Sequence, residues 1–179
     1  MSAADPLAQF VHYGSEAVAA AIVAAAPGLS DDDLRTVLLA EWPRCEAHRP
    51  HRAALVQLYQ QVGFVADGPL PARLAGRTCT VYRGNLGEPE PVGISWTLSR
   101  RQAEFFASYP MTLRGRFLGT YDPTGIPTVW RGTVACAAVL AYYGARDEQE
   151  VVLDPATVRG VHPVSSVDPV ALAARLAAA

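Results

Sequence analysis

One change of pattern along the chain limits the fold more than any other feature. Up to about residue 66 the apolar residues recur at helical spacing, and beyond residue 76 they fall in short β-branched and aromatic runs. Between the two lies Asp67-Gly68-Pro69-Leu70-Pro71, a connector rich in turn residues. Helices followed by strands predict an α+β fold with a mostly antiparallel sheet. We expect a helical lobe over residues 1–66 and a β-rich domain over residues 67–179.

The first part predicts three helices. An alanine-rich segment from about Pro6 to Ala26 is followed by Pro27-Gly28, which ends a helix. The second helix begins after Ser30 and runs to Trp42. Ser30 is a favourable N-cap, and the three aspartates that follow it suit the first turn of a helix. The third runs from about His51 to Val62, with Gly63 at the position after its C-terminus.

The second part predicts strands with one short helix after Ser99 and a last, alanine-rich helix over 168–179. The glycine- and proline-rich residues 84–93 are expected to form a loop. The predicted strands are Thr78–Arg83, Ile94–Leu98, Phe117–Tyr121, Thr128–Ala135, Val139–Tyr143, Glu148–Leu153 and Thr157–His162.

Composition argues against several classes of function. The net charge of -2 and a pI of about 6.1 make nucleic acid an unexpected partner. The apolar run from Ala17 to Ala26 is too short to span a bilayer and has no basic segment before it, so no membrane partner is expected. All 15 basic residues are arginine, which leaves no lysine to act as a base or nucleophile.

The cysteines indicate a reducing compartment. Cys45, Cys79 and Cys136 are far apart and form no Cys-x-x-Cys motif, which predicts free thiols and a cytoplasmic protein. Cys45, His48 and His51 have a spacing that resembles metal ligands. However, Pro50 interrupts any helix there and no fourth ligand is evident, so no metal is expected.

A carboxylate pair precedes the most apolar of the predicted strands. Glu148 and Glu150 come directly before Val151-Val152-Leu153, and on a strand the two glutamates would share a face, about 6 to 7 Å apart. Carboxylates fixed on a rigid element can transfer protons or stabilise charge. The alternative interpretation is a solvated strand end.

Two further motifs lie upstream. Val81-Tyr82-Arg83-Gly84 ends one predicted strand, and Gly93-Ile94-Ser95-Trp96-Thr97 forms the next, with Ser95 and Thr97 on one face. A second Arg-Gly pair occurs at Arg131-Gly132. Each motif alone also fits an ordinary edge strand.

Taken in order, the three motifs resemble the arginine–serine–glutamate class of the ADP-ribosyltransferase fold, including its small bacterial and phage members. The resemblance covers about Thr78 to Asp154. It implies a split sheet of ADP-ribosyltransferase type, NAD as substrate, and activity as a mono-ADP-ribosyltransferase or, with water as acceptor, an NAD glycohydrolase. It also implies that the segment Tyr109–Tyr121 covers the nicotinamide.

The resemblance assigns roles to six residues. Arg83 would contact the NAD phosphates or a ribose, and the backbone of Gly84 would hold the nicotinamide carboxamide. Ser95 would hydrogen-bond the nicotinamide ribose, and Thr97 would steady the strand. Glu150 would be the catalytic glutamate. Glu148 would orient or deprotonate the acceptor, and a glutamate there is the family's pattern for modifying arginine.

Two other interpretations of the sequence stay open. One is a catalytically silent module of the same fold whose helices dock a partner. The other is a structural α+β domain in which the motif matches are accidental. We expect the acceptor to be a protein, while its identity and the oligomeric state have no signal in the sequence.

Overall fold

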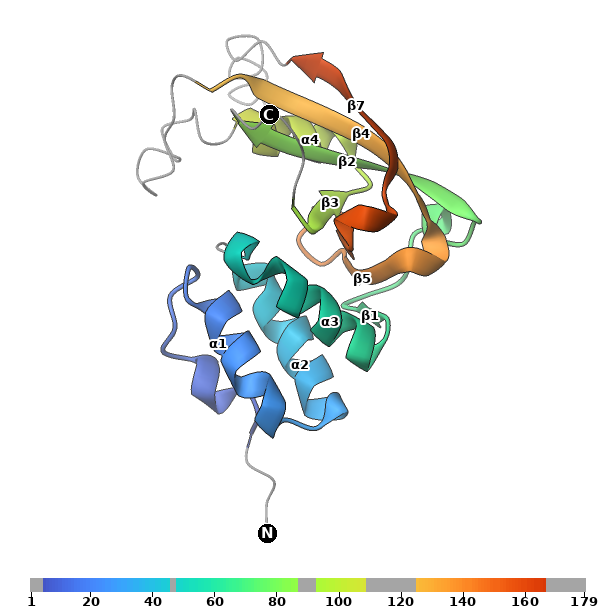
Figure 1. The fold of residues 1–179 in the computed structure, drawn as a ribbon. Coiled ribbons are helices and arrows are strands. Elements are labelled where there is room, and N and C mark those ends of the chain that lie inside the picture. The colour runs from blue at the N-terminus through green and yellow to red at the C-terminus, as the bar shows by residue number, and fades with distance from the viewer. Residues whose placement is uncertain (1–4, 46–47, 87–92, 109–124, 167–179) are drawn as a thin grey trace.

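The computed structural model describes residues 5–45, 48–86, 93–108 and 125–166. Three helices pack together on one side of a twisted sheet, and a fourth helix lies against the far half of that sheet (Figure 1). The sheet has seven strands. The predicted α+β class is therefore confirmed.

The helical lobe contains α1 (Val18–Ala25), α2 (Asp31–Glu41) and α3 (Arg52–Val62). Ser30 caps α2, since its Oγ accepts a hydrogen bond from the Asp33 N–H at 3.2 Å, and Gly63 leaves α3 with a φ of 74°. Both features confirm the sequence prediction. The first predicted helix is wrong in extent, because α1 starts only at Val18. The described residues before it, 5–17, include Gly14 and form a short 3-10 turn, Ala8–Phe10, in place of a longer helix.

Short 3-10 turns connect or follow the regular elements of the described chain. The turn Ala8–Phe10 is η1, and the turns after it are η2 (Ala26–Gly28), η3 (Trp42–Arg44), η4 (Arg49–His51), η5 (Ala72–Leu74), η7 (Cys136–Ala138) and η8 (Pro155–Thr157). Of these, η3 and η4 lie between α2 and α3.

The sheet is mixed, which corrects the prediction of a mostly antiparallel sheet. Its strands follow the order β1-β5-β6-β3-β2-β4-β7, and β1 pairs parallel with β5 while the other neighbouring strands pair antiparallel. The strands are β1 (Val65–Ala66), β2 (Thr78–Leu86), β3 (Ser95–Thr97), β4 (Pro127–Ala135), β5 (Val139–Tyr143), β6 (Glu150–Leu153) and β7 (Arg159–Ser166).

The predicted boundary at residue 66 falls directly after a strand of the sheet. β1 consists of Val65 and Ala66, so the end of the helical lobe enters the sheet beside β5. Two residues give too short a pattern to reveal a strand from sequence.

The helical lobe and the sheet share a hydrophobic core. Val152 of β6 and Ala141 and Tyr143 of β5 pack among buried residues of α1, α2 and α3. Because this apolar surface is removed from water on both sides, it fixes the lobe against β5 and β6 at roughly 25 cal/mol per Å² buried. A second cluster of buried side chains includes Val81 of β2, Trp96 of β3 and Val151 of β6.

The fourth helix, α4 (Arg100–Ser108), lies close against β2. A Cβ at Gly84 would come within 2.5 Å of the Ala107 backbone nitrogen and within 2.9 Å of the Ala103 carbonyl carbon. Only glycine permits this approach of helix and strand. Gly84 is also inside β2, which continues to Leu86, so the predicted loop begins later than residue 84.

Three predicted segments lie wholly outside the described residues. These are the strand Phe117–Tyr121, the segment Tyr109–Tyr121 and the last helix over 168–179. Among the helices that are described, none has both the length and the apolar character needed to cross a bilayer.

Candidate active site

The strand order brings the three motifs side by side. β3 lies between β2 and β6, and a chain of hydrogen bonds crosses all three strands. An Nη1–H of Arg83 donates to the Ser95 carbonyl at 2.6 Å, and the Ser95 hydroxyl donates to Oε1 of Glu150 at 2.5 Å. The arginine, the serine and the glutamate singled out by the sequence therefore occupy one place in the fold.

Arg83 bridges the point where β2 and β3 stop pairing. The two strands are paired only at Tyr82 and Thr97, whereas β2 pairs with β4 over nine positions. Directly after Tyr82, the Arg83 side chain reaches across to the backbone of Ser95. A planar guanidinium in that position suits an anionic or polyhydroxylated ligand.

Gly93 leaves room for the Arg83 guanidinium. A Cβ at Gly93 would lie nearer than 3.0 Å to three guanidinium atoms of Arg83. Arg131, the arginine of the second Arg-Gly pair, lies instead on an exposed part of β4. Its position in the fold therefore favours Arg83 over Arg131 as the arginine of the site, in agreement with the order of the motifs.

Glu150 has an unusual electrostatic environment. Burial is the main reason why the pKa of its carboxyl is raised above the ordinary value of 4.5, and the negative charge of Glu148 adds to this. Hydrogen bonds from Ser95 and Trp42 and the nearby Arg146 act in the opposite direction, since they favour the charged form. Such a partly desolvated and hydrogen-bonded carboxylate is typical of functional sites.

Glu148 is not on the strand, which corrects the prediction of a same-face pair. β6 begins at Glu150, and Gln149 has a φ of 48° and Asp147 a φ of 59°. The left-handed conformation of Gln149 breaks the alternation of side chains, so the strand rule cannot place Glu148 relative to Glu150. Glu148 instead forms an ion pair with Arg146, with Nη2 and Oε2 3.1 Å apart.

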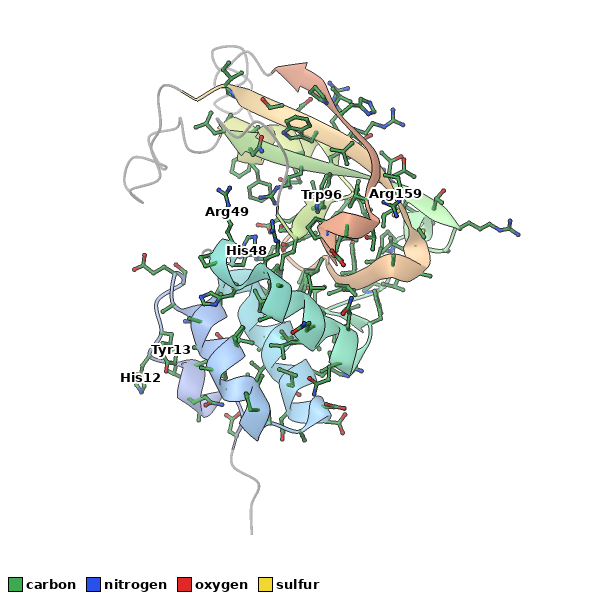
Figure 2. All side chains as sticks on the ribbon, viewed as in Figure 1. His12, Tyr13, His48, Arg49, Trp96 and Arg159 are labelled. Atoms are coloured by element: carbon green, nitrogen blue, oxygen red, sulfur yellow. The ribbon has the colours of Figure 1, made fainter. Side chains whose placement is uncertain are left out.

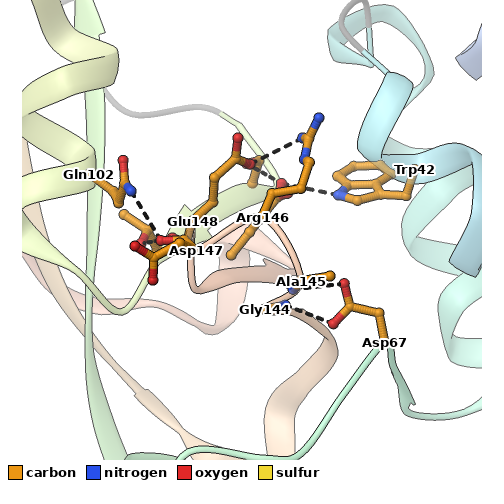
Figure 3. Close-up of polar contacts among 11 residues, drawn as sticks. Trp42, Asp67, Gln102, Gly144, Ala145, Arg146, Asp147 and Glu148 are labelled. Atoms are coloured by element: carbon orange, nitrogen blue, oxygen red, sulfur yellow. Dashed lines mark hydrogen bonds and ion pairs between the residues drawn. The ribbon is translucent and has the colours of Figure 1, made fainter.

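The segment Gly144–Gln149 is nevertheless held firmly (Figure 3). The carboxylate of Asp67 accepts hydrogen bonds from the N–H groups of Gly144 and Ala145 at 2.7 and 3.2 Å. On the other side, the Gln102 side chain of α4 donates to the Asp147 carbonyl at 3.0 Å. Backbone in the left-handed region costs of order 1–3 kcal/mol per residue, and bonds of this kind maintain it. Glu148 is thus presented by a preorganised segment.

Thr97 contributes to that segment from within the structure. Its side chain is buried, and its hydroxyl donates to the Glu148 carbonyl at 2.7 Å while accepting from the Ser99 N–H at 3.0 Å. The bond joins β3 to the segment that carries Glu148, and the role of steadying the strand stays a prediction. Gly84 has a packing role against α4, and its proposed contact with the carboxamide stays a prediction.

Trp42 completes the site and was not identified from the sequence. The residue opens η3, and its indole Nε1–H donates to Oε1 of Glu150 at 3.0 Å from a position 108 residues earlier in the chain. The sequence placed Trp42 only at the end of the second predicted helix. The available signal was chemical, because a buried tryptophan N–H usually has a hydrogen-bond acceptor.

The wider surroundings place other groups near these residues. His48 and Arg49 stand on the side of the helical lobe that faces the sheet (Figure 2), and the His48 ring lies 5.4 Å from that of Trp42. Among the described residues, no three His, Cys, Asp or Glu side chains are grouped to hold a metal ion. A shallow hollow of about 300 Å³ between α3 and the end of β6 includes none of the six predicted site residues.

Comparisons with protein-family models, with curated proteins and with solved structures find no match to this chain.

Proposed function

We propose that the protein cleaves NAD and transfers its ADP-ribose to an acceptor, as an NAD-dependent mono-ADP-ribosyltransferase, or as an NAD glycohydrolase when the acceptor is water. The observation that carries this proposal is the hydrogen-bonded connection from Arg83 through Ser95 to Glu150 across three neighbouring strands. Accidental motif matches would have no reason to converge on one place.

In this proposal Arg83 and Ser95 hold the substrate. Arg83 holds its guanidinium beside Ser95 by donating to the Ser95 carbonyl, and this planar cation would contact a phosphate or a ribose hydroxyl. Ser95 orients the Glu150 carboxylate through Oε1 and accepts a ribose hydroxyl at its own oxygen.

Glu150 stabilises the charge that develops during bond cleavage. The bond between ribose C1′ and the nicotinamide nitrogen breaks, both electrons leave with nicotinamide, and the sugar acquires oxocarbenium character. A preorganised carboxylate close to that carbon lowers the barrier, as carboxylates do in glycoside hydrolysis. The acceptor then attacks C1′ and loses its proton, for which Glu148 is the nearby base.

The acceptor side of the site is the segment that carries Glu148. Its carboxylate is partly exposed and bound to Arg146, so a guanidinium is a chemical group that this position accommodates. We propose a protein side chain, with arginine first, as the acceptor. Free Cys45, Cys79 and Cys136 support a reducing, cytoplasmic setting.

Release of labelled nicotinamide from NAD tests the proposal. Removing one preorganised charge-stabilising group costs ~10²-fold or more in rate, so Glu150→Gln should lose nearly all turnover. Glu16→Gln, which makes the same chemical change at an exposed residue of the helical lobe, is the matched control and should turn over at the wild-type rate. Inactive wild-type protein would favour the silent binding module, and an active Glu150→Gln variant would remove Glu150 from the mechanism.

A further inference from the structure

Two donors converge on a single oxygen of Glu150. The Ser95 hydroxyl and the Trp42 indole N–H both bind Oε1, at 2.5 and 3.0 Å. Across the described parts of the chain no protein donor reaches Oε2. The arrangement fixes the carboxylate plane by one oxygen and leaves the other to a ligand.

The indole of Trp42 is itself held on several sides. It stacks on Tyr143 of β5, with ring centroids 6.3 Å apart and planes inclined by 25°, and it meets the Tyr59 ring of α3 edge-on at 5.6 Å. Trp42 is 3% exposed. Turning the indole away from Glu150 would disrupt these contacts, so the position of its N–H is fixed before any ligand binds.

The two tyrosines are locked in turn by hydrogen bonds. The Tyr143 hydroxyl donates to the Leu38 carbonyl at 2.9 Å, and therefore accepts the hydroxyl proton of Tyr59 at 2.8 Å. This buried network joins α2, α3 and β5 directly behind Trp42. Buried networks whose donors and acceptors are satisfied in this way make a core rigid.

We propose that Trp42 is a positioning residue, through which the helical lobe fixes the orientation of the Glu150 carboxylate for catalysis. The proposal rests on the proposed function and extends it, since it makes the helical lobe part of the active site. The core that the lobe shares with β5 and β6 would then serve to hold Trp42 against Glu150.

The titratable neighbours of Glu150 define how removing the indole donor should change its pKa. Glu148 and Arg146 face it from the β5–β6 segment, while Cys45, Tyr59 and Tyr143 face it from the lobe and β5. Burial raises the pKa of Cys45 to about 12, and the pKa values of both tyrosines are also raised, so all three stay neutral near pH 7. His48 is the titratable group in ring contact with Trp42. Without the indole N–H, the ionised form of Glu150 loses a donor and its pKa should rise further.

The indole N–H signals in a ¹⁵N-correlated NMR spectrum test the contact without any turnover of NAD. The chain has three tryptophans, and Trp96 and Trp130 donate to the Gly93 carbonyl and to the Asn85 Oδ1, which do not titrate. We expect the Trp42 signal to move as Glu150 takes up a proton at acid pH and to stop moving in Glu150→Gln. A Trp42 signal that does not titrate, or that titrates equally in Glu150→Gln, would overturn the proposal.

Trp42→Phe keeps an aromatic ring and removes the N–H donor together with part of the buried indole. The ¹³Cδ titration of Glu150 should move to higher pH in this variant, and kcat for nicotinamide release should fall about tenfold or more with little change in KM, as expected for a lost hydrogen bond to a charged group. Trp130→Phe is the matched control and should leave the Glu150 titration unchanged. A purely structural role would lower the melting temperature and leave the midpoint in place, which would refute positioning.

Failure of this inference differs from failure of the proposed function. If wild-type protein releases no nicotinamide, the proposed function fails, while the two NMR titrations still measure whether Trp42 controls Glu150. Should Trp42→Phe not fold, the wild-type indole titration and its loss in Glu150→Gln decide the matter alone.

Discussion

Gly93→Ala perturbs the site through the geometry of a single side chain. The new methyl group would lie nearer than 3.0 Å to three atoms of the Arg83 guanidinium, whereas ordinary contact begins at 3.4 Å. The φ of Gly93 lies outside the left-handed range, so alanine is compatible with the backbone there. Because the obstacle is the far end of a flexible side chain, Arg83 would move and the strand would not.

The expected size of the effect follows from that movement. A guanidinium displaced on the order of 1 Å loses the 2.6 Å hydrogen bond to the Ser95 carbonyl and its orientation toward the substrate. A misplacement of this size costs ~10²-fold in reaction rate. This corresponds to about 2.7 kcal/mol of transition-state stabilisation. The charge of the site and the residues Arg83, Ser95 and Glu150 would all be unchanged.

Steady-state nicotinamide release by Gly93→Ala should therefore show a kcat/KM about 10²-fold below wild type, with a melting temperature close to it. Gly76→Ala is the matched control, since its Cβ would meet only ordinary contacts at 3.6 and 4.0 Å. Activity of Gly93→Ala within twofold of wild type would refute the claim that Arg83 acts from the position described. A large fall in melting temperature would show that the strand yields instead of the side chain.

Two predictions concern stability. Tyr143→Phe should destabilise the fold by about 1–3 kcal/mol, because the Leu38 carbonyl and the Tyr59 hydroxyl both lose a buried partner. Tyr59→Phe should cost less, since Tyr143 still donates to the Leu38 carbonyl. Urea titrations measure both free energies of unfolding, and the reverse order would contradict the assigned direction of these hydrogen bonds. Because the pKa of Glu150 is raised, the folded state binds a proton on this carboxyl more tightly than the unfolded chain does. The resulting stabilisation is complete below about pH 4.5 and is lost as the pH rises through the pKa of the folded state. Glu150→Gln should therefore gain melting temperature relative to wild type as the pH rises above about 4.5, and a difference that stays constant with pH would argue against a raised pKa.

Local signals in the sequence were sufficient for much of the fold. Ser30 and Gly63 mark the start of α2 and the end of α3 because capping depends on neighbouring backbone groups. The order of the Arg83, Ser95 and Glu150 motifs was also informative, since each stands on or beside a strand with its own apolar pattern. These features require no knowledge of distant parts of the chain.

Features that depend on long-range contacts could not be predicted. Nothing near Trp42 reveals a partner 108 residues away, and the two-residue strand β1 forms only because β5 offers an edge. The position of Glu148 failed for a different reason. Gln149 adopts a left-handed φ that bonds from Thr97 and Gln102 to the neighbouring backbone help to maintain, and a rule of alternating side chains has no means to detect it.

The most direct test of the claim that Ser95 and Glu150 act together in one site is a double-mutant cycle on nicotinamide release with Ser95→Ala and Glu150→Gln. If Ser95 acts largely by orienting Glu150 through the 2.5 Å hydrogen bond, its removal should cost several-fold less in the Glu150→Gln background than in wild type. Equal losses in both backgrounds, or full activity in both single variants, would contradict a site formed by these strands.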